Sequence, residues 1–113
     1  MSKINRSLLQ EQIQEELKLF KEKHPRSLKM FERSKEYFLN GVPMNWMTRW
    51  AGEFPIFVKE ARGAHFTDVD GNRFLDFCLG DTGAMAGHAP KAAVEAITRQ
   101  AAMGNTFMLP TEE

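Results

Sequence analysis

The stretch that decides the fold is "PIFVKEARGAHFTDVDGNRFLDF", residues 55–77. Its segments "PIFVKE" and "AHFTDV" are rich in β-branched and aromatic residues, as strands are, and the "ARG" between them is a turn. "DVDGNRF" then supplies an Asp-Gly turn of the kind that closes a two-residue hairpin, and "RFLDFCL", residues 73–79, reads as the third strand. We therefore predict a three-stranded antiparallel meander over residues 56–79, with Asp70 and Gly71 as turn residues rather than catalytic ones.

Two helices are predicted before the meander. The first covers residues 8–23, begins at the capping box Ser7-Leu8-Leu9-Gln10 and carries apolar side chains at helical spacing. His24-Pro25 interrupts it, and a second helix begins near Pro25, a residue suited to a first helical turn. This second helix is expected to end at about Leu39, with Asn40-Gly41 as its C-cap.

One helix is predicted after the meander. It begins at Pro90 and ends at Ala102 or Met103, with Gly104 as its stop. Its buried face is expected to hold small and aliphatic residues, namely Ala93, Val94, Ile97 and Ala101. The prediction is thus an α+β chain of N-terminal helices, a three-stranded antiparallel meander and then a helix, with a helical segment over residues 1–40 and a second part over residues 41–113.

Composition narrows the classes of function. The chain has 113 residues, 42% of them hydrophobic and 27% charged, which is ordinary material for one small domain. Lys plus Arg balance Asp plus Glu at 15 each, so no nucleic-acid partner is expected. The single cysteine, Cys78, excludes an internal disulfide framework and a cysteine-based zinc site, and we expect it to be a small core side chain of the third strand. No metal site, membrane span or signal peptide is predicted, and a cytoplasmic location is expected.

A run of small residues follows the third strand. "GDTGAMAGH", residues 80–88, holds three glycines and two alanines, which allow a backbone to approach another group closely. Either a compact ligand or a tightly packed turn explains such a run, and spacing alone favours the turn. His88, at its end, is expected to hydrogen-bond nearby backbone rather than to act as a base.

The segment before the meander has no regular period. "GVPMNWMTRWAGE", residues 41–53, contains both tryptophans, two methionines and an arginine. Irregular backbone with such side chains either packs down on a surface or lines a pocket.

Together these motifs resemble a known family. "PIFVKEARGAHFTDVDGNRFLDF", "GAMAGHAP", "AVEAI" and "NTFMLPTEE" occur in an order similar to the N-terminal quarter of a class III, fold-type I aminotransferase that uses pyridoxal 5′-phosphate (PLP). The most similar branch is that of glutamate-1-semialdehyde aminomutase and the β-amino-acid transaminases. The resemblance covers roughly residues 30–113 and implies that the meander is part of the small domain.

The resemblance also implies which residues approach the substrate. In this family the small-residue loop turns into the active-site cleft, and the irregular segment reaches into the substrate pocket. Gly83, Gly87 and His88 match the family's pattern, whereas Asp81 stands where the aminomutases often have an aromatic residue, which leaves the substrate open. The substrate-pocket candidates are Trp46, Met47, Arg49, Asp81, Thr82 and Gly83. Arg49 suits a bidentate grip on a carboxylate, although a surface arginine is at least as common.

No catalytic residue is predicted in this chain. PLP chemistry needs a Schiff-base lysine, an acidic partner for the ring nitrogen and a phosphate cradle, and in the resembled family all three come after the point where this chain stops. Lys91 opens a helix with no such partners and is not a substitute. No cofactor-binding residue is assigned, and residues 41–113 are expected to end at the start of a missing large domain.

The expected function follows from the resemblance. The chain is expected to be the N-terminal fragment of a PLP-dependent aminotransferase or aminomutase, which transfers an amino group between a small amino acid and a keto acid or semialdehyde. It would supply substrate-pocket and dimer-contact residues to a full-length homodimer and be inactive alone. The alternative is a non-catalytic interaction module derived from such an enzyme.

Overall fold

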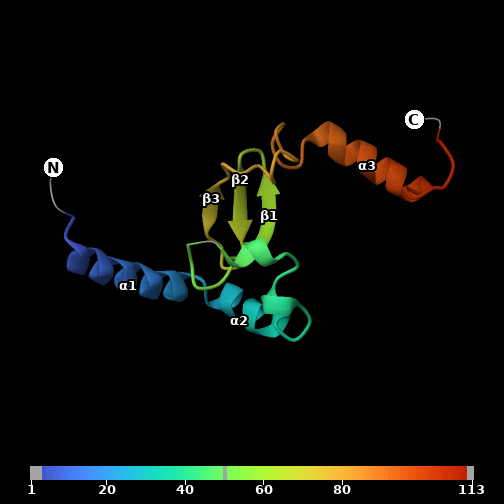
Figure 1. Cartoon of the computed structure of the whole chain (residues 1–113). Coiled ribbons are helices and arrows are strands. Elements are labelled where there is room, and N and C mark those ends of the chain that lie inside the picture. Colours follow the sequence, from blue (N-terminus) through green and yellow to red (C-terminus); the bar gives the residue numbers. More distant parts are fainter. Residues whose placement is uncertain (1–3, 50, 112–113) are drawn as a thin grey trace. The chain divides into compact units, whose positions relative to one another are not determined.

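The computed structural model describes residues 4–49 and 51–111 (Figure 1). Its elements form an α+β chain, as predicted. In chain order they are the helices α1 (Arg6–Lys23) and α2 (Pro25–Ser34), the 3₁₀ helices η1 (Leu39–Gly41) and η2 (Asn45–Thr48), the strands β1 (Val58–Arg62), β2 (His65–Asp68) and β3 (Arg73–Leu75), and the helix α3 (Lys91–Met103). Trp50, Glu112 and Glu113, which belong to motifs quoted above, lie outside the described residues.

The three strands confirm the predicted meander, but β1 begins at Val58 and includes Ala61 and Arg62, so the turn predicted at "ARG" was wrong in its first two residues. They form one antiparallel sheet in the order β1-β2-β3. The third strand is shorter than the predicted residues 73–79, because the carboxylate of Asp76 accepts hydrogen bonds from the backbone N–H groups of Cys78 and Leu79 and turns the chain out of the ladder. Cys78 therefore lies beyond the strand and is exposed, so the expectation that it is a core side chain was wrong.

The chain divides into two compact units. The first comprises Met1–Glu60 and Thr67–Arg73, and the second Ala61–Phe66 and Phe74–Glu113. Aromatic side chains form the centre of the first unit: the Phe54 ring lies 4.8 Å from that of Phe20 and 6.4 Å from that of Phe31. In the second unit, the rings of Phe66 and Phe74 stack at 5.0 Å.

The helix α1 begins slightly earlier than predicted. Its N-cap is Asn5, whose side-chain oxygen accepts hydrogen bonds from the Leu8 backbone N–H at 3.2 Å and from the Ser7 hydroxyl at 2.8 Å. The capping box predicted at Ser7 was therefore wrong, because Asn5 satisfies the free N–H group first. The helix ends at Lys23, as predicted.

The helix α2 begins at Pro25, as predicted, but it ends at Ser34 rather than at Leu39. The Ser34 hydroxyl donates to the carbonyl of Phe31 at 2.8 Å and lies 2.6 Å from the carbonyl of Gly41. This hydroxyl joins the last turn of the helix to the segment that folds back over it, and the backbone of Asn40 has a φ of 58°. The prediction failed because the residues after Ser34 have helical composition, while the contact that ends the helix is made by a residue farther along the chain.

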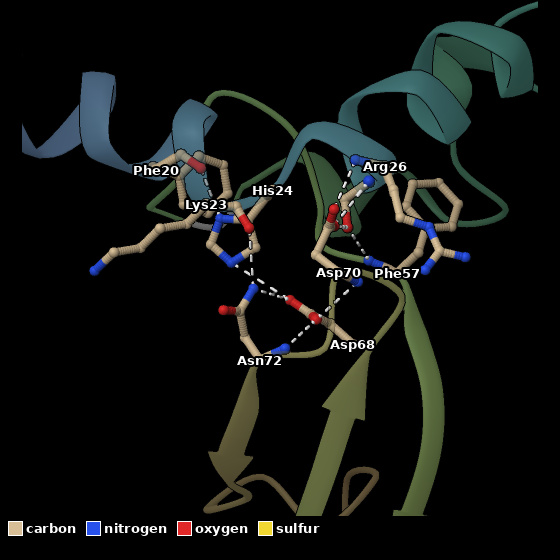
Figure 2. A network of polar contacts seen from close by, with 9 residues as sticks. Phe20, Lys23, His24, Arg26, Phe57, Asp68, Asp70 and Asn72 are labelled. Carbon is tan, nitrogen blue, oxygen red and sulfur yellow. Dashed lines mark hydrogen bonds and ion pairs between the residues drawn. The ribbon is translucent and has the colours of Figure 1, made fainter.

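The hairpin turn between β2 and β3 caps the beginning of α2 (Figure 2). The N-cap residue of α2, His24, makes no side-chain capping bond. The carboxylate of Asp70 instead accepts hydrogen bonds from the backbone N–H groups of Arg26 at 2.6 Å and Ser27 at 3.0 Å, and from the Ser27 hydroxyl at 2.8 Å. Asp70 and Gly71 thus lie in the predicted turn, and Asp70 also provides a helix cap.

Beneath this cap lies a buried carboxylate. Asp68 accepts hydrogen bonds from the backbone of Asp70 at 3.0 Å and of Asn72 at 2.7 Å, and from the Asn72 side chain at 2.9 Å. Its Oδ2 lies 3.4 Å from Nε2 of His24, and the His24 Nδ1 donates to the Phe20 carbonyl at 2.7 Å. The turn is therefore tied by side chains both to itself and to the junction of α1 and α2 (Figure 2).

The helix α3 has the predicted extent, with Pro90 as its N-cap and Gly104 as its C-cap. Its predicted buried face was wrong, since none of its residues is buried and Ile97 is 67% exposed. A helical apolar pattern predicts a face that can be covered, but it does not say what covers it. Among the described helices, none combines the length and apolar character needed to cross a membrane.

Candidate functional site

The small-residue loop has an unusual backbone. Leu79, Gly80, Asp81 and Thr82 follow one another with φ angles of 52°, 58°, 54° and 76°. This left-handed region costs an L-residue roughly 1–2 kcal/mol, so residues other than glycine normally visit it singly. Strain of this kind persists only where the surroundings enforce it, and it concentrates at functional sites.

Backbone hydrogen bonds fold the loop on itself. The N–H of Ala84 donates to the carbonyl of Leu79 at 2.8 Å, and that of Gly83 donates to Gly80 at 3.2 Å. The N–H of Gly87 donates to Ala84 at 2.8 Å. The loop is therefore a compact structure with its own hydrogen bonds rather than an open connection.

A side-chain pair joins the two ends of this loop. Nε2 of His88, at the exit, lies 2.6 Å from Oδ2 of Asp76, at the entrance, and the two side chains are only 22% and 12% exposed. Oδ1 of Asp76 accepts the backbone N–H of Cys78 at 2.9 Å and that of Leu79 at 3.0 Å. The hydrogen bond from His88 and then that from Leu79 lower the pKa of Asp76, so its carboxylate is ionised over the neutral pH range.

A backbone pair also holds the exit of the loop. His88 and Gly63 exchange two hydrogen bonds, with N···O distances of 2.8 and 2.9 Å. Gly87 has a φ of 87°, and a Cβ placed on it would lie 3.2 Å from the Cα of Gly63. One glycine of the small-residue run is therefore explained by close approach of backbone to backbone, which is the packed-turn alternative of the sequence analysis. The side chain of His88 binds a carboxylate rather than the nearby backbone that was expected.

The candidates Asp81, Thr82 and Gly83 lie together on this loop, and all three are exposed. The side chains of Asp81 and Thr82 extend from left-handed backbone. Gly83 has ordinary backbone, and a Cβ on it would meet only the Gly80 carbonyl oxygen, at 3.3 Å. A larger side chain at Gly83 would therefore need the Gly80 carbonyl to shift by a few tenths of an ångström.

The candidates Trp46, Met47 and Arg49 lie together around η2, in the first compact unit. Trp46 is 46% exposed, and its Nε1 donates to the sulfur of Met44 at 3.2 Å. Met47 is half-buried, and Arg49 is exposed at the C-cap of η2. The structure therefore groups the six candidates as two sets of three, one in each unit.

Lys91 was considered in the sequence analysis as a lysine that could meet PLP. Lys91 is a surface lysine at the beginning of α3, with a side chain that is 90% exposed and an Nζ 3.7 Å from the carboxylate of Glu95 one turn later. Such a solvated lysine does not fit the position of a Schiff-base lysine, which needs the cofactor ring and phosphate fixed beside it. Within residues 4–49 and 51–111, no group of three or more His, Cys, Asp or Glu side chains is arranged to hold a metal ion.

Asp76 is a residue of this loop that no sequence motif singled out. In the alternation of "RFLDFCL" it falls on the same face as Phe74, which is half-buried, whereas the neighbouring Phe77 is 89% exposed. A charged residue on the more buried face of a strand needs a partner, and this signal was available. The identity of the partner was not, because the pairing with His88 depends on how the intervening loop folds.

No family model matches the chain, whereas individual proteins do. The glutamate-1-semialdehyde 2,1-aminomutase of Methanocaldococcus jannaschii is 35% identical over 91 residues, which are 80% of this chain and 21% of that protein. The chain thus spans about a fifth of the length of the curated relatives it matches.

Solved structures agree with the sequence relatives. A glutamate-1-semialdehyde aminomutase from Pseudomonas aeruginosa matches with a TM-score of 0.87 and 46% identity, over 96% of this chain and 24% of that one. A variant of the same protein has been solved in complex with PMP. An omega-transaminase from Sphaerobacter thermophilus matches with a TM-score of 0.68 and 32% identity, over 76% of this chain and 19% of that one. The resemblance found in the motifs is confirmed. The chain belongs to the class III family of PLP-dependent aminotransferases and corresponds to a part of their length.

Proposed function

We propose that this chain forms part of a PLP-dependent enzyme that moves an amino group between a small amino acid and a keto acid or semialdehyde. The observation that carries the proposal is the match to the Pseudomonas aeruginosa aminomutase, which extends over 96% of this chain at 46% identity. The PMP bound to a variant of that protein supports PLP as the cofactor of the whole enzyme. The chain contributes surface to the substrate, and other residues of the enzyme hold the cofactor.

In this proposal the two sets of candidates shape the substrate pocket. Asp81, Thr82 and Gly83 lie exposed on a strained loop, which is where residues that meet a ligand are commonly placed. Arg49 is exposed and suits a carboxylate of the substrate. In this proposal residues 1–40 are a helical segment and residues 41–113 belong to the small domain.

Contact with a further protein surface is also part of the proposal. Large apolar side chains are exposed on α1 and α3, among them Leu9, Ile13 and Ile97. A surface with so many exposed apolar side chains is unusual for a monomer, and it suits contacts with the rest of the enzyme and with the second subunit of a cytoplasmic homodimer. The same exposed side chains would serve the non-catalytic interaction module. A measurement of amino transfer is therefore needed to distinguish the enzyme from the module.

A chimaeric aminomutase tests the proposal. This chain replaces the matching quarter of the Pseudomonas aeruginosa aminomutase, and amino transfer and PLP absorbance are measured against the parent enzyme. We expect cofactor binding close to that of the parent and measurable amino transfer. A folded chimaera that binds PLP but shows no turnover with any amino donor tried would contradict the proposed role and favour the interaction module.

The chain alone provides the matched control. Titration with PLP, followed by borohydride reduction and mapping of the modified lysines, should give scattered, substoichiometric labelling and no amino transfer, because an aldimine needs a lysine held beside a fixed cofactor and Lys91 is solvated at the beginning of α3. Stoichiometric labelling of one lysine such as Lys91, with turnover, would show that the chain is an enzyme by itself.

A further inference from the structure

The loop that carries Asp81, Thr82 and Gly83 does not hold its shape by residue preference. Three non-glycine residues, Leu79, Asp81 and Thr82, have φ between 52° and 76°. An isolated chain would relax these residues to right-handed or extended backbone. Contacts must therefore keep the loop in this conformation, and besides its internal hydrogen bonds the two ends of the loop make such contacts.

The ends of the loop meet at one carboxylate. Oδ1 of Asp76 takes the backbone N–H of Leu79, the first left-handed residue, at 3.0 Å. Oδ2 of the same carboxylate lies 2.6 Å from Nε2 of His88, the residue that follows the loop. Because one rigid carboxylate binds both the entrance of the loop and the imidazole at its exit, releasing the imidazole leaves Asp76 free to rotate and loosens the entrance.

The two side chains are placed for a lasting contact. They are 12% and 22% exposed, so water competes with the pair less than it does with a surface ion pair. The backbone of His88 is itself fixed by its two hydrogen bonds to Gly63. The imidazole therefore projects from a fixed backbone position and closes the loop through its contact with Asp76.

We propose that Asp76 and His88 are positioning residues: their contact, here named the clasp, holds residues 79–87 in the strained conformation that presents Asp81, Thr82 and Gly83 to the substrate. The clasp itself touches neither substrate nor cofactor. This inference rests on the proposed function for its effect on the substrate, while the existence of the clasp is independent of it.

The test uses the chimaeric aminomutase and two variants of one residue. His88→Leu removes the donor and keeps much of the volume, whereas His88→Gln keeps an N–H donor near the place of Nε2. His65→Leu, in β2, is the matched control, since His65 lies outside the clasp. Hydrogen exchange of peptides covering residues 76–89 measures how firmly the loop is held. KM and kcat for the amino substrate measure the effect of the loop on substrate binding and turnover.

We expect His88→Leu to speed exchange at the N–H groups of Leu79 and Ala84 about tenfold or more, the factor that loss of a charge-assisted hydrogen bond brings. KM for the amino substrate should rise about tenfold, with kcat changed by less than about threefold and the cofactor spectrum unchanged, because substrate binding and not the cofactor is affected. His88→Gln should recover most of both effects, and His65→Leu should show neither.

Three results would overturn parts of this inference separately. Unchanged exchange in His88→Leu would show that the clasp does not hold the loop. Fast exchange with unchanged KM would retain the clasp and remove its role toward the substrate. An inactive chimaera in which His88→Leu still speeds exchange would count against the proposed function and not against the clasp. If His88→Leu does not fold, His88→Asn, whose amide is too short to reach Asp76, takes its place with the same expected outcomes.

Discussion

Two aspartate–histidine pairs hold two loops of this chain, and they do so in different ways. Asp68 is fully buried, and its Oδ2 lies 3.4 Å from His24. Asp76 is partly exposed and lies 2.6 Å from His88. In the first pair the carboxylate is shared among several donors of its own turn, whereas in the second it connects two ends of a longer loop.

The backbone between the paired elements differs as well. In the turn of residues 68–72, positive φ falls on Gly71, which has open space where a Cβ would be. In the loop after β3 it falls on Leu79, Asp81 and Thr82, which pay for it in strain. A buried carboxylate beside relaxed backbone serves stability, while a carboxylate that holds strained and exposed backbone serves the shape of a surface. The predictions below, all for the chimaeric aminomutase, test this division.

The largest expected effect is on stability, from Asp68→Ala. The substitution leaves the N–H groups of Asp70 and Asn72 without their buried acceptor, which should lower the free energy of unfolding by about 3 kcal/mol or more. Urea denaturation measures it, with exposed Asp81→Ala as the control. Equal losses in the two variants would remove the distinction between a structural turn and a surface loop.

Two glycines sharpen the comparison. Gly87→Ala should cost about 2–3 kcal/mol, because a positive φ and a Cβ 3.2 Å from the Cα of Gly63 add together. Gly71→Ala should cost only about 1 kcal/mol, since its φ of 93° is unfavourable but no atom lies within 4 Å of the new Cβ. The midpoints of thermal unfolding of the two variants measure this difference. A larger fall in the midpoint for Gly71→Ala than for Gly87→Ala would contradict the prediction.

Gly83→Val separates function from stability. Its backbone is ordinary, but a Cβ would lie 3.3 Å from the Gly80 oxygen, so that carbonyl must shift slightly and the free energy of unfolding should fall by about 1 kcal/mol, less than for Gly87→Ala. The branched side chain should nonetheless enter the substrate pocket and lower kcat/KM about tenfold or more. A variant with full kcat/KM, or with stability loss alone, would make this part of the loop merely structural.

The smallest expected effect is on how stability depends on pH. Burial raises the pKa of Asp70, but the hydrogen bonds from Arg26 and Ser27 outweigh it, and the pKa lies below its ordinary value. A pKa lowered by folding adds stability above the unfolded pKa of about 3.9, and that stability is lost as pH falls through the folded pKa. Asp70→Asn should therefore lose about 0.5 kcal/mol at pH 7 and fall less steeply below pH 4. If the urea midpoints of Asp70→Asn and of the unsubstituted chimaera ran parallel from pH 6 to pH 2, the prediction would be contradicted.

The sequence predicted the parts of the fold that depend on local chemistry. The Asp70-Gly71 turn set the meander, and Pro25 and Pro90 marked the beginnings of α2 and α3. The end of α2 was missed because the Ser34 hydroxyl that closes it lies 2.6 Å from the carbonyl of Gly41, a contact that composition does not show.

The place of the candidate site stays a prediction, and the shape of its loop was not predicted. Family resemblance led to Asp81, Thr82 and Gly83, and they do lie together on one exposed loop. No residue preference predicts left-handed backbone at Leu79 or Thr82, since both types avoid it. The contact between Asp76 and His88 that accompanies it joins residues 12 apart and exists only once the loop is folded.

The cap on α2 has a consequence for how this chain folds. Asp70 follows Arg26 by 44 residues in sequence, so the first turn of α2 receives its capping acceptor only when the hairpin has closed. Contacts between residues so distant in sequence require a large loop to close, and they slow the search for the native state. Formation of α2 and of the β2–β3 hairpin should accordingly be one cooperative event, in which the helix stays frayed at its beginning until the strands have paired.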